Sequence, residues 1–462
     1  MFGLLLSFLV GLLIILWISN RFHPLVYIGL AFPVGISTQT FMTFLWNFIG
    51  FHFGVISILV ISLFLVIICA YGIYRKYEPK SYKDVFEIDL KSLLNEFTAP
   101  SLVFVGLSIF VVYAISVKSM FWPTLGIDSL TSFDLYAKAL AAEGTLLNSL
   151  IMDQRVGFGA AYPPLYSLSL SYSFLLGFES SKIIPTLFFI SFAIAFFGFT
   201  WTASSVTISS IVTLFALVTP EMLAQSAINT TSVPQASIAA LGIMSLMNWQ
   251  YSKDKGYFWL AILLLAANGF IRSEGIIYIG LAFIAVAVLS LQSRDYSRPV
   301  LFIVLSMIPF VLWQIFLRVH ADVMNTFVQV EISYIPNLDF DNLSYLFGLA
   351  LNTIGQTTYY GATLFVFIAF IVLNGFYTVK YKDQLTLLLI ILGIFVGYIA
   401  LLNQFTLRAD SMENVIAFSG KRFFFGITNL IWFYVGTTRV TKWLFARFEP
   451  DMQLRHLIKT SE

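Results

Sequence analysis

Long apolar runs recur along almost the whole chain, and their length limits what it can fold into. Of 462 residues, 59% are hydrophobic and only 11% are charged. A soluble domain is nearer to half apolar, whereas about 20 consecutive apolar residues are needed to cross a bilayer. Backbone groups in lipid must be hydrogen-bonded within the chain, and these runs are too long and uniform for barrel strands. We therefore predict an all-α polytopic membrane protein.

The apolar runs, which end at charges, glycine or proline, predict roughly 11–14 transmembrane helices. Their ranges are 2–19, 25–48, 54–74, 98–117, 182–203, 206–219, 233–249, 257–271, 275–291, 300–317, 359–379, 384–402 and 422–438. Two shorter apolar pieces, 163–178 and 343–357, carry more polar residues. The first run lacks the charged start and cleavage site of a signal peptide, so we expect it to span the membrane.

Lysine and arginine gather in loops that would lie on one side of the membrane. Cytoplasmic loops carry an excess of these residues, so we predict that this side faces the cytoplasm. The residues concerned are Arg75, Lys76, Lys80, Lys83, Lys91, Lys253, Lys255, Arg294, Arg298, Lys380, Lys382 and Arg439. All of these residues lie on the same side of the membrane only if residues 163–178 do not cross it. We therefore predict that residues 163–178 form a juxtamembrane or re-entrant segment.

This topology divides the chain into three parts. Residues 1–97 form N-terminal helices and a cytoplasmic loop, residues 98–438 form the main transmembrane module, and residues 439–462 form a basic cytoplasmic tail. The main module carries a long outer loop over 118–162. Segments 220–232, 318–342 and 403–421 also fall outside, and we expect them to line one cavity with that loop.

The polar segment at residues 126–165 is the longest interruption within the main module. Leu130, Phe133, Ala137 and Leu140 recur at three- and four-residue spacing, which predicts an amphipathic helix from Ser129 on the membrane surface. A glycine that follows at position 144 is a typical helix stop. The Tyr-Pro-Pro sequence at 162–164 predicts an extended turn and then a new helix.

Several charged residues of the polar segment have two interpretations. Asp128 is either an N-cap or a carboxylate that takes a proton from an acceptor hydroxyl or binds a divalent cation such as Mg²⁺ or Mn²⁺. Asp134 and Lys138 have the spacing of a helical ion pair, but Lys138 can instead meet a phosphate. Arg155 is either a phosphate ligand or a solvated surface charge.

Further charges stand next to apolar runs, where ionisable residues are costly and usually functional. Arg272 and Glu274 interrupt an apolar region and either pair with each other or belong to a site. Lys421 and Arg422 begin the last apolar run on the predicted outer side, as interface anchors or as phosphate ligands. Arg408 lies in the same outer loop.

Residues 128–139 (DSLTSFDLYAKA) and 162–166 (YPPLY) together resemble the first outer loop of the GT-C superfamily of membrane glycosyltransferases. The likeness is greatest to the bacterial aminoarabinose-transferase and protein O-mannosyltransferase group. Three more segments are similar to that module in the same order, at 219–234, 269–275 and 419–433. Phe133 stands where the group often has Trp, and Ser232 and Val233 stand where it often has an acidic residue. The resemblance covers 122–434, and the first three helices are additional.

The resemblance implies a transferase that moves a sugar from a polyprenyl-phosphate donor to a glycan, lipid or protein hydroxyl. The reaction would take place on the outer face of a bacterial plasma membrane. Asp128 would be the general base. The substrate-binding residues would be Asp134, Lys138, Arg155, Tyr162, Arg272, Glu274, Arg408, Lys421 and Arg422. The partners would be the lipid donor, the acceptor and the bilayer, but no nucleic acid.

Two other functions fit a chain of this composition. A polymerase or ligase of lipid-linked glycans would depend on an outer-loop arginine such as Arg408 rather than on Asp128. A secondary transporter or lipid flippase would have midplane charges and an inverted repeat, and the sequence has no internal repeat. The sequence also has no His/Cys metal spacing and no GxxxxGKS/T motif.

Overall fold

The computed structural model describes residues 2–77, 95–124, 126, 128–153, 162–323, 340–406, 413, 416 and 420–446. These residues form helices and connecting loops, and no strand occurs among them. Seven helices are long and apolar enough to cross a membrane. They are α2 (Pro24–Phe48), α3 (Val55–Lys76), α6 (Ala99–Phe121), α10 (Ile183–Ala203), α16 (Ser297–Val319), α19 (Thr363–Tyr381) and α20 (Leu385–Thr406). The protein is thus an all-α polytopic membrane protein.

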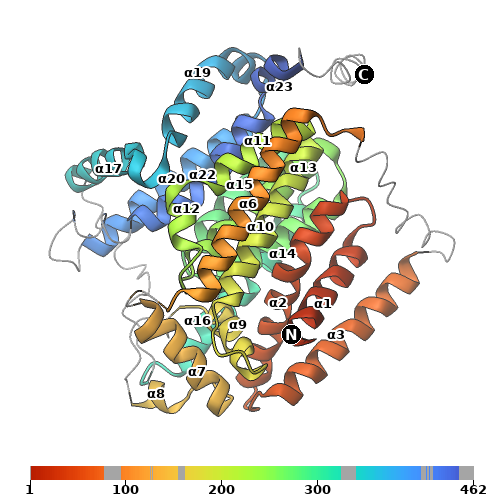
Figure 1. The fold of residues 1–462 in the computed structure, drawn as a ribbon, viewed down its shortest axis with the longest axis vertical. Coiled ribbons are helices and arrows are strands. Elements are labelled where there is room, and N and C mark those ends of the chain that lie inside the picture. The colour runs from red at the N-terminus through yellow and green to blue at the C-terminus, as the bar shows by residue number, and fades with distance from the viewer. Residues whose placement is uncertain are drawn as a thin grey trace.

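Shorter apolar helices complete the bundle. They are α1 (Phe2–Ile18), α11 (Val206–Leu217), α14 (Lys255–Ile271) and α15 (Gly275–Ser293). The centre is formed by α13 (Ser232–Ser252), which is buried from Ser232 to Trp249 and packs against α10, α14 and α22 (Lys421–Thr437). In Figure 1, α1, α2 and α3 lie together on one flank of this core.

The basic loops meet at one end of the bundle, which we call the basic end. The Tyr251 hydroxyl at the end of α13 donates to Gln384 Oε1 in the α19–α20 loop (3.0 Å). Gln384 Nε2 donates in turn to the carbonyl of Thr437 at the end of α22 (3.1 Å). Arg298, after α15, lies over the ring of Trp249 in α13. The segregation of basic residues that the sequence predicts is therefore present in the fold.

Short helices gather at the opposite end, the loop end. They include the π-helix η1 (Asp128–Phe133), α7 (Asp134–Glu143), α8 (Ser149–Met152), α9 (Leu165–Leu175), α12 (Pro220–Gln225) and α18 (Thr357–Tyr360). Helix α17 (Phe340–Gly355) packs beside α20, away from α7 and α8 in Figure 1. In Figure 1, α7 and α8 lie at the lower end, and α23 (Arg439–Ala446) lies at the upper, basic end. The Ser129 hydroxyl donates to the carbonyl of Asn229 (3.0 Å), which joins the polar segment to the α12–α13 loop.

The chain between α6 and α10 leaves and re-enters the bundle at the same end. Lys182 Nζ donates to the carbonyl of Trp122, and the Ser119 hydroxyl donates to the carbonyl of Lys182 (3.3 Å). Within this segment α9 has 11 residues, which is too short to span a bilayer, and its residues 165–173 are buried. Segment 163–178 therefore does not cross, as the basic residues predicted.

The predicted span at 359–379 is wrong in one respect, because two helices occupy it. Helix α18 ends at Tyr360, and α19 begins at Thr363. Between them Gly361 has a φ of 58°, a left-handed conformation that a continuous helix does not contain. The piece predicted at 343–357 forms α17, whose 16 residues fall short of a full span.

Candidate functional site

The polar segment is an ordered unit, although its start differs from the prediction. Asp128 is the first residue of η1 rather than a residue before a helix that begins at Ser129. Phe133, Ala137 and Leu140 are buried as the spacing predicted, but Leu130 is exposed. Helix α7 ends as predicted at Gly144, which has a φ of 67° and would meet the carbonyl of Phe53 if it carried a Cβ.

Asp128 makes an ion pair with the first turn of α22. Arg422 Nη1 lies 2.5 Å from Asp128 Oδ2, and the two residues are 294 positions apart in the chain. Their side chains are 32% and 23% exposed, so the pair is open to solvent. Arg422 Nε has no hydrogen-bond partner among the described residues. The carboxylate predicted as the base thus contacts a cation predicted to bind phosphate.

Arg272 and Glu274 form a second and different pair at the loop end. Arg272 donates from Nε and Nη2 to the two carboxylate oxygens of Glu274, at 3.2 and 2.7 Å. Both side chains are buried. The guanidinium also lies 5.3 Å from the ring centroid of Tyr162 and 5.0 Å from that of Phe423. The mutual pair is confirmed, and a role of either residue in substrate binding stays a prediction.

A series of contacting aromatic side chains runs from this buried ion pair into the bundle. Phe423 stacks on Tyr398 with ring centroids 5.3 Å apart, and the Tyr398 hydroxyl donates to the Tyr278 hydroxyl (3.2 Å). Burial raises the pKa of Tyr162, which keeps this hydroxyl neutral beside the charges. No sequence feature singles out Phe423, Tyr278 or Tyr398 among the 48 Phe and 22 Tyr residues of the chain.

Asp134 anchors the polar segment and does more than pair with Lys138. The predicted ion pair is present at 3.0 Å, but the Asp134 side chain is only 9% exposed. Asp134 Oδ1 accepts hydrogen bonds from the Ser181 hydroxyl (2.5 Å) and from Asn229 Nδ2 (3.3 Å). Lys138 itself is 57% exposed and lies over the ring of Phe174. The alternative that Lys138 meets a phosphate stays a prediction.

The remaining predicted cation of α22 faces another helix. Lys421 Nζ lies 5.4 Å from the ring centroid of Tyr359, and the carbonyl of Lys421 accepts from the Tyr360 hydroxyl (2.6 Å). Nearby α12 carries Glu221, a buried carboxylate that accepts from Gln225 Nε2 (2.8 Å). The resemblance places an acidic residue near Ser232 and therefore does not point to Glu221.

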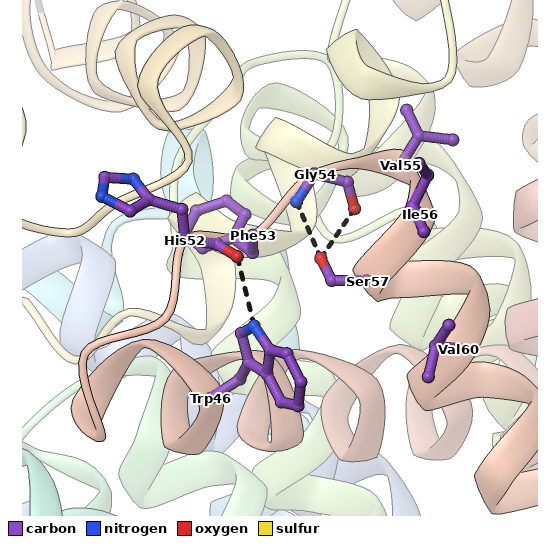
Figure 2. A pocket seen from close by; sticks show the side chains of 8 residues that line it. All are labelled: Trp46, His52, Phe53, Gly54, Val55, Ile56, Ser57 and Val60. Carbon is purple, nitrogen blue, oxygen red and sulfur yellow. Dashed lines mark hydrogen bonds between the residues drawn. The ribbon is translucent and has the colours of Figure 1, made fainter.

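Two large cavities lie away from the ion pairs. The first, of about 590 Å³, is formed where α2 ends and α3 begins, and Figure 2 shows the Trp46 indole donating to the carbonyl of His52 on its wall. The second, of about 560 Å³, is apolar and lies between α11, α19 and α22. Neither is lined by Asp128, Lys138 or Arg422, so the predicted common cavity of these three residues is not one of them.

Two predicted site residues, Arg155 and Arg408, lie outside the described residues. Among the residues that the structure does describe, no three His, Cys, Asp or Glu side chains come close enough to hold a metal ion. The sequence matches no protein-family model, no curated protein and no solved structure.

Proposed function

We propose that the protein is a membrane glycosyltransferase that moves a sugar from a polyprenyl-phosphate donor to an acceptor hydroxyl. The observation that carries the proposal is the contact between Asp128 and Arg422. It joins a proton acceptor to a phosphate-binding side chain at a partly exposed position. General-base catalysis needs a proton acceptor within reach of the acceptor hydroxyl, and stabilisation of a leaving phosphate needs a positive charge near the donor.

The reaction assigns one role to each group. The acceptor oxygen forms a bond to the anomeric carbon of the sugar, and the bond between that carbon and the donor phosphate oxygen breaks. The acceptor proton passes to the carboxylate of Asp128. The phosphate leaves with the bonding electron pair, and the guanidinium of Arg422 stabilises its negative charge.

The apolar cavity beside α22 supports a lipid-linked donor. Along α11 its lining runs from Ile208 to Phe215, which is about 10 Å of helix. At the loop end it is closed by Tyr360, whose hydroxyl binds the carbonyl of Lys421. An apolar groove of this kind suits a polyprenyl chain, and from α22 its lining includes Trp432 and Val435.

The basic loops support an orientation in the membrane. They share one end of the bundle, and basic loops face the cytoplasm in most membrane proteins. The loop end, with Asp128 and Arg422, then faces outward. This orientation fits a bacterial plasma membrane in which a lipid-linked sugar is used on the outer side.

The test combines lipid identification with a substitution. We expect mass spectrometry of the purified protein to detect a polyprenyl-phosphate sugar. Transfer from that lipid should fall about 100-fold or more in Asp128→Asn, because a positioned base contributes roughly 10²–10⁴-fold. Glu143→Gln, an exposed acid of the same segment, is the matched control and should keep its activity. Wild-type turnover by folded Asp128→Asn would contradict the proposal, and dependence on Arg408 instead would indicate the polymerase or ligase class.

A further inference from the structure

The pairing of Arg422 is incomplete. Of the guanidinium N–H groups only Nη1 contacts Asp128, and Nε is buried and has no partner among the described residues. A guanidinium has a planar fork of donors that suits two oxygens of a phosphate at once. The present contact therefore uses one donor of a group that can bind an anion through two.

The neighbouring pair shows what a permanent ion pair looks like in this protein. Arg272 reaches both oxygens of Glu274, both side chains are buried, and two aromatic rings cover the guanidinium. The Asp128–Arg422 pair has one contact and is partly exposed. Exposed single-contact pairs are weak, so an anion that makes two contacts can replace the carboxylate.

We propose that the phosphate of the lipid donor displaces Asp128 from Arg422, and that this exchange releases the base. While Asp128 Oδ2 is held by Arg422, that oxygen is not available to an acceptor hydroxyl. Once the phosphate occupies the guanidinium, the carboxylate is free at the position where the acceptor arrives. Donor binding therefore frees Oδ2 to accept the proton of the acceptor hydroxyl. This inference rests on the proposed function, because it takes the ligand to be a phosphate-linked lipid.

The test measures binding rather than transfer. The full-length protein in nanodiscs of zwitterionic lipid is titrated with a polyprenyl monophosphate, with unphosphorylated polyprenol and with inorganic phosphate. The polyprenyl monophosphate reports the binding of head group and tail together. The polyprenol reports the binding of the tail alone, and inorganic phosphate reports the binding of the phosphate alone. Asp128→Asn should bind the polyprenyl monophosphate about fivefold more tightly than the wild type, because the competing carboxylate is gone. Its affinity for polyprenol should not change.

Two further variants make the result specific. Arg422→Gln should bind the polyprenyl monophosphate about tenfold more weakly, since one charge-assisted contact is lost. The double variant should match Arg422→Gln, because Asp128 acts only through that side chain. Glu143→Gln removes a negative charge from the same segment without touching Arg422 and should bind like the wild type. Thermal unfolding of each variant confirms that it is folded.

Equal tightening in Asp128→Asn and Glu143→Gln would overturn the exchange, because it would indicate a general charge effect. Unchanged or weaker binding in Asp128→Asn would also overturn it. If the wild type transfers sugar but Asp128→Asn binds the polyprenyl monophosphate no more tightly than the wild type does, only the proposed exchange is contradicted. Tighter binding by Asp128→Asn, with no transfer by the wild type from any lipid-linked sugar, would contradict only the proposed function.

Discussion

Asp134 is a carboxylate in a position where almost no water reaches it. Three partners compensate its charge, namely Lys138, the Ser181 hydroxyl and the Asn229 amide. Ser181 precedes α10 and Asn229 precedes α13, so one side chain holds the polar segment against two other parts of the chain. Buried polar groups in such a network are costly to leave unpaired.

We expect Asp134→Ala to loosen the polar segment. The substitution leaves the Ser181 hydroxyl without its acceptor, at a cost of about 1–3 kcal/mol, while the Asn229 amide keeps its hydrogen bond to Ser181 Oγ (2.7 Å). Thermal unfolding in detergent should report lower stability, and limited proteolysis should cut residues 126–165 faster. Asp134→Asn keeps one acceptor oxygen and should lose less stability than Asp134→Ala. If Asp134→Ala resists heat and protease as the wild type does, Asp134 is not an anchor.

The sequence predicted some of these residue contacts and not others. The i,i+4 spacing of Asp134 and Lys138 is local, and the pair is present. The contact of Asp128 with Arg422 crosses 294 positions, so no local spacing could have predicted the pairing itself. Asp128 was predicted to be the base from the resemblance of its loop, and Arg422 was predicted to bind phosphate from its place at the head of an apolar run. Which partner each would meet depends on the fold.

At the scale of elements, α1 and α2 approach each other very closely at two glycines. A Cβ on Gly11 would overlap the carbonyl oxygen of Ala31, and one on Gly35 would overlap that of Ser7. Small residues allow membrane helices to pack backbone against backbone. The N-terminal helix therefore approaches α2 backbone against backbone at these two glycines.

We expect Gly35→Ala to separate α1 from α2 and to lower stability by about 1–3 kcal/mol, the usual cost of overpacking. The matched control is Gly106→Ala in α6, where a new Cβ meets nothing within 4 Å. Thermal unfolding of both variants in the same detergent is the measurement. A Gly35→Ala protein as stable as the Gly106→Ala protein would contradict the close contact.

Helix boundaries were predictable to within a few residues wherever bilayer thickness sets the length of an apolar run. The run at 25–48 became Pro24–Phe48, and the run at 275–291 became Gly275–Ser293. Prediction failed at Gly361, where a residue with a positive φ separates α18 from α19 near the start of the predicted run. Hydrophobicity reports burial in lipid or protein, but it does not report the backbone angle of a single residue.

At the scale of the whole molecule, the polarity of the bundle can be tested directly. The one cysteine of the chain, Cys69, is buried, so Cys69→Ser gives a background without thiols. Glu143→Cys then reports on the loop end and Tyr296→Cys on the basic end, since both residues are exposed. A membrane-impermeant maleimide should label Glu143→Cys in intact cells and Tyr296→Cys only after permeabilisation. Labelling of both variants in intact cells would contradict the two-ended bundle.

The hydrogen bonds between Lys182 and the end of α6 have a consequence for how the protein can diversify. They join the end of α6 to the residue that precedes α10, so the segment between the two helices begins and ends at the same place. The entropy of closing a loop grows only slowly with its length. The contact between α6 and α10 can therefore persist while the length of the exposed part of the segment varies, provided that the buried α9 keeps its packing.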